Sequence, residues 1–283
     1  MPGTLYVVAT PIGNLDDMPP RVAATFGLAD FVAAEDTRVT LKLLNHLGLK
    51  KPMVSYFEHN AAQRGGQILA RIQAGENCAL CSDAGMPAIS DPGEQIVTDA
   101  LELGIPVVPV PGASACVTAL AVSGQPTARF VFEGFLPVPR RARAQRLESL
   151  KREERTVIFY EAPHKLRGTL ADLAGAFGEQ RSLTLCRELT KLHEEIFKTT
   201  IGGAMARYAE EAPRGEFVLV MAGAAPEETE EAPPTLEEAV AAARALMAQG
   251  QSASAAAKAA AAQSPFGKGE IYRLLCREEE GDE

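Results

Sequence analysis

Short apolar runs alternate with amphipathic segments over the first 122 residues. The runs have the length of buried strands and fall at residues 5–9, 31–34, near 54, 78–81 and 107–110. Helical spacing of apolar positions follows each run, at residues 20–28, 37–47, 62–74, 94–103 and 113–122. Apolar strands that alternate with helices predict a parallel sheet covered on both faces. We therefore expect an α/β domain over residues 1–122.

A second cycle of strands and helices occupies residues 123–224. Strand patterns fall at residues 130–135, 156–160, 182–186, 195–200 and 216–222. Helix patterns fall at residues 140–152, 164–177 and 203–211. Two of the strands follow one another without a helix between them, which favours a mixed sheet. The chain is thus predicted to contain two α/β domains.

The remaining residues predict a linker and a helical tail. Residues 225–234 are rich in Pro and Glu, which is typical of a linker. Residues 235–283 contain three short helix patterns, at 236–248, 253–262 and 268–276. This spacing suits a helix-turn-helix. The tail is either a nucleic-acid-binding unit or a small packing appendage.

Composition narrows the class of protein. Of the 283 residues, 46% are hydrophobic and 23% are charged, which excludes a disordered, collagen-like or coiled-coil chain. Five cysteines form no disulfide framework, so a reduced cytoplasm is the simplest location. The first apolar run lacks the basic residues of a signal peptide. Residues 103–128 carry no charge but several Pro and Gly, so we expect no membrane helix there.

The net charge of −9 hides an uneven distribution. Residues 1–120 have a net charge of −5, residues 121–225 of +3 and residues 226–283 of −7. Much of the positive charge in the middle third falls in residues 140–155, with seven basic and three acidic residues. This segment is either a solvated helix face or a surface that follows phosphates. The total charge alone therefore does not exclude a nucleic-acid partner.

Three loops at predicted strand ends carry the clearest signals of a ligand site. Residues 9–15 (ATPIGNL) match neither G-x-G-x-x-G nor a Walker loop, which weakens dehydrogenase and P-loop interpretations. Residues 81–93 (CSDAGMPAISDPG) bring backbone close to a ligand, and Asp83 is placed to receive a hydroxyl or amine. Residues 111–115 (PGASA) place small residues at a helix start. Carboxyl ends of parallel strands share one edge, so we expect one crevice.

Other polar clusters are either parts of a site or ordinary structural features. In residues 35–38 (EDTR), Asp36 is either a helix N-cap or part of an active-site rim. Residues 187–191 (RELTK) are either a surface ion-pair cluster or a second part of that rim. Cys78 and Cys81 form a C-x-x-C, but no second Cys or His pair has metal spacing. We expect no metal site.

Taken in order, the motifs resemble those of the tetrapyrrole-methylase superfamily, whose members use S-adenosylmethionine. The matching segments are TPIGNL (10–15), AEDTR (34–38), SDAG (82–85), DPG (91–93), PVPG (109–112), FEGFLP (132–137), FYE (159–161), RELTK (187–191) and GEFVL (215–219). The EDTR and RELTK segments resemble the branch that methylates the ribose 2'-oxygen of cytidine 1402 in the decoding region of 16S rRNA. Two positions depart from the family pattern, with Lys165 in place of Arg and Met86 in place of Thr.

The resemblance implies a fold of two α/β domains with the methyl donor between them and a helix-turn-helix-like tail. By position, it implies that residues from both domains border the donor. They are Pro11, Asp83, Gly85, Ile89, Ser114, Ala115, Tyr160, Glu161, Leu189 and Leu219. It further implies a homodimer that acts on 16S rRNA or the small ribosomal subunit, with no membrane partner.

Transfer to a ribose hydroxyl is mainly a positioning task, assisted by a base that removes the proton. The sequence leaves three base candidates open: Asp36, His59 and Glu188. Candidates for contacts with RNA phosphates share a positive charge near the loops or on the basic helix. They are Arg38, Arg140, Arg141, Arg143, Arg187 and Lys191. Two alternatives remain: a family member that methylates a tetrapyrrole or protein side chain, and a non-catalytic RNA-binding assembly factor.

Overall fold

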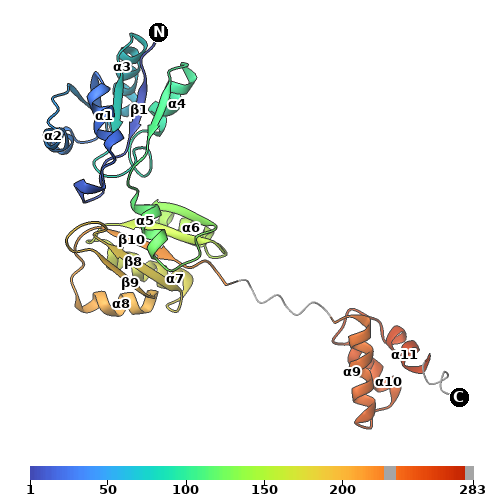
Figure 1. Ribbon diagram of the computed structural model, residues 1–283. Helices are drawn as coiled ribbons and strands as arrows, with labels where there is room; N and C mark the ends of the chain where they lie inside the picture. The colour runs from blue at the N-terminus through green and yellow to red at the C-terminus, as the bar shows by residue number, and fades with distance from the viewer. Residues whose placement is uncertain (226–233, 278–283) are drawn as a thin grey trace. The chain divides into compact units, whose positions relative to one another are not determined.

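The computed structural model describes residues 1–225 and 234–277. The chain divides into two compact units, Met1–Ala224 and Ala225–Glu283, and each is described by itself (Figure 1). The first unit contains two five-stranded sheets, and the described part of the second contains helices alone. The predicted α/β fold class is confirmed.

The first sheet is entirely parallel, with the strand order β3-β2-β4-β1-β5. Its strands are β1 (Leu5–Val8), β2 (Phe31–Ala34), β3 (Met53–Ser55), β4 (Cys78–Cys81) and β5 (Val107–Val110). All four residues of both β2 and β4 are buried, as expected for central strands covered on both faces. The parallel order places the loops after β1, β4 and β5 next to one another.

Helices cover both faces of this sheet. They are α1 (Pro20–Leu28), α2 (Thr37–His46), α3 (Ala61–Gln73) and α4 (Glu94–Glu102). Apolar residues of α1 and α2 pack on one face, and those of α3 and α4 pack on the other. A short 3-10 helix, Leu15–Asp17, follows β1 and was not predicted. The first half of the chain is thus the three-layer structure that its hydrophobic pattern indicated.

The second sheet is mixed, with the order β6-β7-β10-β8-β9. Its strands are β6 (Phe130–Phe135), β7 (Thr156–Glu161), β8 (Ser182–Arg187), β9 (Glu195–Thr200) and β10 (Phe217–Met221). Only β6 and β7 pair in parallel, and the other neighbours are antiparallel. The absence of a helix between β8 and β9 predicted this change of direction.

The second sheet is also covered on both faces (Figure 1). Its helices are α5 (Ala115–Val122), α6 (Arg140–Ser149), α7 (Leu166–Phe177) and α8 (Ile201–Glu210). Apolar residues of α6, α7 and α8 pack on one face. Helix α5 packs on the other face, against β7, β8 and β10. The sequence placed α5 with the first sheet, but its apolar side chains are buried on the second.

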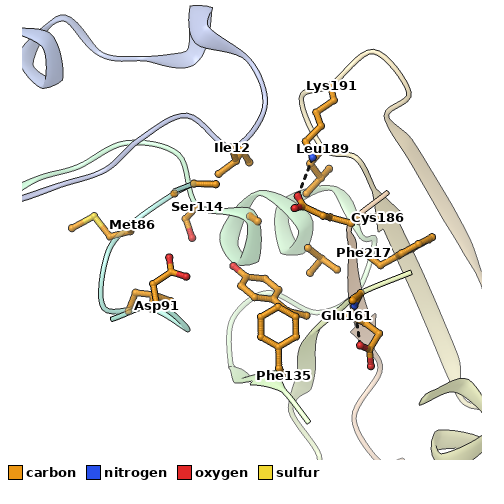
Figure 2. Close-up of a pocket in the computed structure, with 18 of the residues that line it drawn as sticks. Ile12, Met86, Asp91, Ser114, Phe135, Glu161, Cys186, Leu189, Lys191 and Phe217 are labelled. Atoms are coloured by element: carbon orange, nitrogen blue, oxygen red, sulfur yellow. Dashed lines mark hydrogen bonds and ion pairs between the residues drawn. The ribbon is translucent and has the colours of Figure 1, made fainter. Parts of the chain in front are cut away.

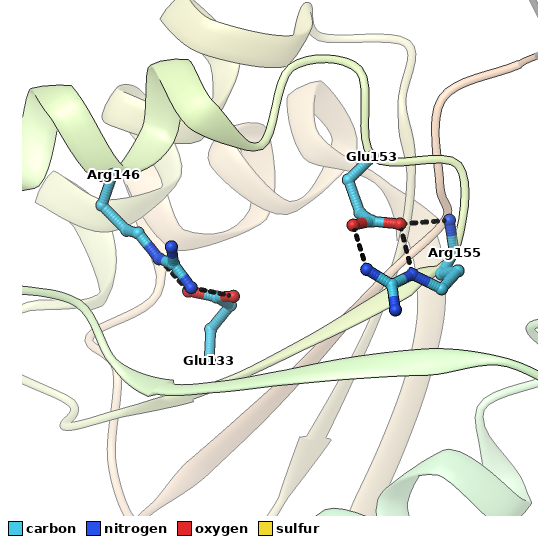
Figure 3. Close-up of polar contacts among 4 residues, drawn as sticks. All are labelled: Glu133, Arg146, Glu153 and Arg155. Carbon is cyan, nitrogen blue, oxygen red and sulfur yellow. Dashed lines mark hydrogen bonds and ion pairs between the residues drawn. The ribbon is translucent and has the colours of Figure 1, made fainter.

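One ion pair attaches α6 to the second sheet, and another closes the turn that follows α6 (Figure 3). The Arg146 guanidinium donates to Glu133 in β6 at 2.5 and 2.7 Å. Glu133 lies at an irregularity in the β6–β7 register, where the bulge turns its nearly buried carboxylate toward the helix. Arg155 donates in the same bidentate manner to Glu153. Part of the basic segment therefore stabilises the fold.

The second unit is a small three-helix cluster. Its helices are α9 (Leu236–Ala248), α10 (Ala253–Ala261) and α11 (Lys268–Arg277). Thr235 and Glu238 form a reciprocal capping box at the start of α9. Ala243, Ala256 and Ile271 are fully buried at the centre of its apolar core. None of the described helices, in residues 1–225 or 234–277, is long and apolar enough to cross a membrane.

Candidate active site

The loops after β1 and β4 are joined directly at the carboxyl edge of the first sheet. The backbone N–H of Thr10 donates to the carbonyl of Gly85 at 2.8 Å, and the N–H of Gly85 donates to the carbonyl of Thr10 at 3.0 Å. Gly85 has a φ of +84°, a conformation that side-chain-bearing residues rarely adopt. Two of the three loops predicted to share a crevice therefore form one continuous wall.

A cavity of about 380 Å³ lies beside this wall and extends to the second sheet (Figure 2). Its lining comes from the loops after β1, β4 and β5, the start of α5, and the ends of β6, β7, β8 and β10. The lining residues are Ile12, Ala84, Gly85, Met86, Ile89, Asp91, Ser114, Ala115, Phe135, Tyr160, Glu161, Ala162, Pro163, Cys186, Leu189, Lys191, Glu216, Phe217 and Val218. The volume and largely apolar lining are typical of a site for a small organic ligand.

The two sides of the cavity meet at Tyr160. The Tyr160 hydroxyl oxygen accepts a hydrogen bond from the backbone N–H of Cys116 at 3.0 Å. Phe132 and Phe135 contact the ring edge-to-face, at centroid distances of 4.9 and 5.6 Å. Burial raises the pKa of Tyr160 to about 12, so the hydroxyl stays neutral at physiological pH. A neutral hydroxyl that accepts from Cys116 keeps its own proton available to a ligand.

A carboxylate faces the cavity from the loop after β4. Asp91 lines the cavity, and Figure 2 shows its oxygens beside the Ser114 hydroxyl. Burial raises the pKa of Asp91 to about 6, and the negative charges of Glu35 and Asp83 add to this effect. In the sequence, Asp91 stands out only as part of a loop motif. Its proximity to two other carboxylates depends on how β2 and β4 pair, which no local pattern reveals.

Most of the residues expected to border the donor do line this cavity. They are Gly85, Ile89, Ser114, Ala115, Tyr160, Glu161 and Leu189. Glu161 contributes its backbone, because its carboxylate accepts hydrogen bonds from the backbone N–H of Ala162 and the hydroxyl of Thr169. Figure 2 shows this carboxylate directed away from the cavity.

Leu219 does not line the cavity, because its side chain lies on the other face of β10. It is fully buried in the core between the second sheet and helices α6 to α8. Its neighbour Val218 points to the opposite face and lines the cavity. Successive side chains of a strand face opposite sides, so a displacement of one residue changes the face. Val218, and not Leu219, therefore lines the cavity.

Pro11 and Asp83 lie in a neighbouring hollow of about 240 Å³, also lined by Asn14, Val39 and Lys42. The Asp83 carboxylate accepts a hydrogen bond from the backbone N–H of Asp36 at 3.1 Å. Burial raises the pKa of Asp83, and the charge of Asp36 adds to this effect. The hydrogen bond between Asp36 and Asp83, and a second from the Asp83 N–H to the Glu35 carboxylate at 3.2 Å, join the EDTR and SDAG motifs, as expected for loops at one edge of the sheet.

The three candidate bases behave differently from Asp91, and none lines the cavity formed by the described residues. Asp36 caps α2 and accepts from Arg38, and these hydrogen bonds lower its pKa to about 2. Burial raises the pKa of Glu188, but hydrogen bonds from the Glu216 N–H and from Lys191 lower it on balance. His59 is exposed after β3, with its ring 6.3 Å from that of Phe57.

The candidate RNA-binding cations fall into two groups. Arg140 and Arg141 are exposed at the start of α6 and make no ion pair within the part of the chain that the structure describes. Arg143 is different, because it pairs with Asp172 at 2.5 Å and donates to Thr169 at 2.7 Å. Arg38, Arg187 and Lys191 are paired with Asp36, Glu195 and both Glu188 and Glu216, respectively.

Sequence reasoning missed part of the cavity wall. Phe135 and Cys186 stand at the ends of β6 and β8, and Ile12 and Met86 stand in the loops of the first sheet. Phe135 is 56% exposed, which is unusual for a large apolar side chain beside a cavity. An aromatic at the end of a predicted strand was a usable signal for Phe135. The others required the packing of one sheet's loops against the other sheet.

The cysteines give no sign of a metal or redox centre. Cys78 and Cys81 are free and buried in β4, and burial raises the pKa of the Cys81 thiol to about 12. Within residues 1–225 and 234–277, no group of three His, Cys, Asp or Glu side chains is arranged to hold a metal ion.

Comparison with known proteins places the chain among methyltransferases. A family model described as Tetrapyrrole (Corrin/Porphyrin) Methylases matches residues 4–204. The ribosomal RNA small subunit methyltransferase I of Synechocystis sp. is 50% identical over 273 residues, covering 96% of this chain and 97% of that protein. The protein of the same name from Bacillus subtilis is 46% identical over 229 residues, covering 81% and 78% of the two chains.

Solved structures agree in fold. The uroporphyrin-III C-methyltransferase from Thermus thermophilus, complexed with S-adenosylhomocysteine, matches with a TM-score of 0.55 and 16% identity, covering 77% of this chain and 97% of that one. Cobalt precorrin-4 methyltransferase matches with a TM-score of 0.56 and 18% identity, covering 77% and 94%. At these identities the likeness establishes the fold alone.

Proposed function

The chain belongs to the tetrapyrrole (corrin/porphyrin) methylase family and is a methyltransferase, and we propose that it methylates the ribose 2'-oxygen of a cytidine in 16S rRNA. S-adenosylmethionine supplies the methyl group. The specific target within this proposal is cytidine 1402 of the decoding region. The observation that carries the substrate assignment is the 50% identity, over almost the whole of both chains, to a curated ribosomal RNA methyltransferase.

The cavity fits the donor that the family uses. Its size suits a nucleoside-sized ligand, and Ile12, Leu189 and Val218 provide apolar walls. Gly85 belongs to one wall, where its φ of +84° favours glycine and a Cβ would contact the Ile12 side chain at 3.4 Å. The exposed backbone at the start of α5, beside Ser114 and Ala115, offers hydrogen-bond donors to the polar end of the ligand.

Methyl transfer from a sulfonium is an in-line displacement, so the protein mainly has to align two reacting atoms. S-adenosylmethionine supplies an activated methyl group when bound. The chain supplies a rigid wall from the Thr10–Gly85 bridge and a second wall from Tyr160, which is fixed by Cys116. Apolar side chains at both walls exclude water from the reacting centre.

The RNA side of the site is assigned to exposed positive charge near the cavity. Arg140 and Arg141 begin the helix that follows β6, and β6 itself ends at the cavity residue Phe135. Lys191 lines the cavity, and Arg38 is 87% exposed beside the neighbouring hollow. These cations support contacts with the phosphates around the target cytidine.

The same proposal includes the partner and the setting. We assign the small ribosomal subunit or its 16S rRNA as the partner, a homodimer as the active assembly and the cytoplasm as the location. The names of the curated relatives support the first. Sedimentation of the purified protein at several concentrations tests the homodimer, which predicts a mass of twice 30.1 kDa.

A transfer assay tests the function directly. Purified protein and labelled S-adenosylmethionine are incubated with small subunits, naked 16S rRNA, large subunits and uroporphyrinogen III in parallel. The proposal predicts labelling of 16S rRNA, free or assembled, and not of the other two. Label in the tetrapyrrole would assign the chain to another branch of the family. A chain that binds RNA but not the donor would instead be an assembly factor.

A further inference from the structure

The loop that carries Asp91 has an unusual, tightly held backbone. Ala88 and Ser90 have φ values of +68° and +61°, although both bear side chains. Such conformations are unfavourable for residues with side chains and persist where the surroundings enforce them. Gly93 completes the turn, and a Cβ there would lie 3.1 Å from the Ala88 Cβ. The local geometry therefore fixes the position of the intervening Asp91.

The second sheet holds the same loop from the other side. A Cβ on Gly134 would lie 2.6 Å from the Ser90 hydroxyl oxygen, so a larger residue here would force the Ser90 side chain to move. Gly134 has a φ of +61° and belongs to the register irregularity of β6. The bulge thus accommodates the residue next to Asp91. Asp91 is positioned by both parts of the site, although it belongs to only one.

Among the residues of the described chain that line the cavity, Asp91 is the one aspartate. Three groups of the first sheet act on its pKa: a hydrogen bond with the Ser82 side chain lowers it, and the negative charges of Glu35 and Asp83 raise it. From the second sheet, the Tyr160 hydroxyl lies close enough for the charge of Asp91 to raise the pKa of Tyr160. Lys191 and Glu216 line the same cavity and form an ion pair with each other at 2.9 Å. No cation in this set pairs with Asp91, so its carboxylate is available to accept a proton.

We infer that Asp91 is the group that accepts the proton of the target ribose hydroxyl, an inference that rests on the proposed function. As the ribose oxygen forms its bond to the methyl carbon, the carbon–sulfur bond breaks and its electron pair remains on sulfur. The hydroxyl proton passes to the Asp91 carboxylate and then to water. Charge balances, because the cationic sulfonium becomes a neutral thioether and one proton is released.

The pKa values agree with this assignment. A general base works best when its pKa lies near the working pH, and burial raises the pKa of Asp91 to about 6. Asp36 is a much weaker base, since its hydrogen bonds with Arg38 lower its pKa to about 2. Asp91 must be ionised to act. The transfer rate is therefore expected to be full above about pH 7 and to fall as pH drops through about 6.

Three variants test the inference in the full-length protein. Asp91→Asn removes the base with little change of shape, and Asp91→Glu keeps a carboxylate. Glu102→Gln is the matched control, because it removes one exposed carboxylate from α4 at a residue that lines no part of the cavity. Each is examined by calorimetry with S-adenosylhomocysteine, by single-turnover transfer between about pH 5 and pH 8, and by carboxyl NMR titration.

The expected results separate a base from an anchor for the donor. Asp91→Asn should bind S-adenosylhomocysteine within about twofold of wild type and transfer methyl about 10²- to 10⁴-fold more slowly. It should lose the acid limb near pH 6, together with a carboxyl titration near 6 in the ligand-free protein. Asp91→Glu should recover part of the rate, and Glu102→Gln should match wild type.

Two outcomes would overturn the inference. A transfer rate for Asp91→Asn within tenfold of wild type would mean that another group, or water alone, takes the proton. A loss of S-adenosylhomocysteine affinity as large as the loss of rate would make Asp91 a donor anchor. Failure of the proposed function looks different, since the wild-type protein itself would then methylate no 16S rRNA.

Discussion

The hydroxyl oxygen of Tyr160, a residue that lines the cavity, accepts a 3.0 Å hydrogen bond from the backbone N–H of Cys116. Tyr160 is the penultimate residue of β7 in the second sheet, whereas Cys116 is the second residue of α5, the helix that follows the last strand of the first sheet. One of the unpaired N–H groups at a helix start is thus satisfied by a side chain from another element. This contact sets the distance between the loop of residues 111–115 and the second sheet.

Replacing Tyr160 by Phe should loosen this contact without destroying the fold. The N–H of Cys116 would lose its partner, and the Phe132 and Phe135 rings would keep their apolar contacts. We expect a loss of about 1 kcal/mol in the free energy of unfolding. Donor affinity should fall several-fold. Chemical denaturation and calorimetry with S-adenosylhomocysteine measure the two effects. Unchanged affinity would show that Tyr160 has no part in donor binding.

Enlarging residues in the cavity wall should block donor binding. Gly85→Val adds strain at a φ of +84° and bulk near Ile12, and Ala115→Leu fills the start of α5. Both proteins should unfold cooperatively, and their affinity for S-adenosylmethionine should fall at least tenfold. Gly168→Ala is the control, because a Cβ in that part of α7 meets no atom within 4 Å. Wild-type affinity in both wall variants would place the donor elsewhere.

Arginines of the basic helix should separate into RNA contacts and structural residues. The double variant Arg140→Ala and Arg141→Ala should weaken RNA binding and leave stability within about 0.5 kcal/mol of wild type. The slope of its plot of log affinity against log salt concentration should be shallower by the amount that corresponds to the loss of about one or two phosphate contacts. Arg143→Ala should instead lower stability, because Arg143 ties α6 to Asp172 and Thr169. Filter binding and thermal denaturation distinguish the two groups, and equal behaviour would refute the division.

Removal of the helical tail should affect RNA binding alone. The tail forms a separate compact unit with its own apolar core. Over residues 239–277 it carries five basic residues against Glu270. Truncation after Ala225 should therefore leave donor affinity unchanged and weaken RNA binding, with a loss that shrinks as salt rises. Equal RNA binding and methylation by the truncated and full-length proteins at low salt would make the tail a structural appendage.

The sequence predicted the fold and the edge of the sheet that carries the site, because both depend on local patterns. Apolar runs such as Cys78–Cys81 and the loops that follow them are continuous in the chain. What it missed depends on tertiary pairing. Val218 rather than Leu219 lines the cavity, a matter of which face of β10 meets α5. The environment of Asp91 likewise arises from the neighbouring β2 and β4, whose loops are far apart in sequence.

The pairing of charges was also beyond sequence reasoning. Arg143 differs from Arg140 and Arg141 only in its direction from α6, which depends on where α7 packs. Glu188 and Lys191 pair with each other. Glu188 also accepts from the Glu216 N–H, and Lys191 also donates to the Glu216 carboxylate, contacts that depend on the pairing of β8 with β10. Residues chosen by their charge as bases or as RNA contacts therefore include several that hold parts of the fold in place.

Mass spectrometry of 16S rRNA from cells with and without the gene tests the central claim most directly. Nuclease fragments that span the decoding region are compared, and the ribose methyl is located by its resistance to alkaline cleavage. We predict a 2'-O-methylcytidine at position 1402 in wild-type cells, its loss in the deletion strain and its return with the intact gene but not with Gly85→Val. Identical methylation of 16S rRNA in the two strains would contradict the assignment.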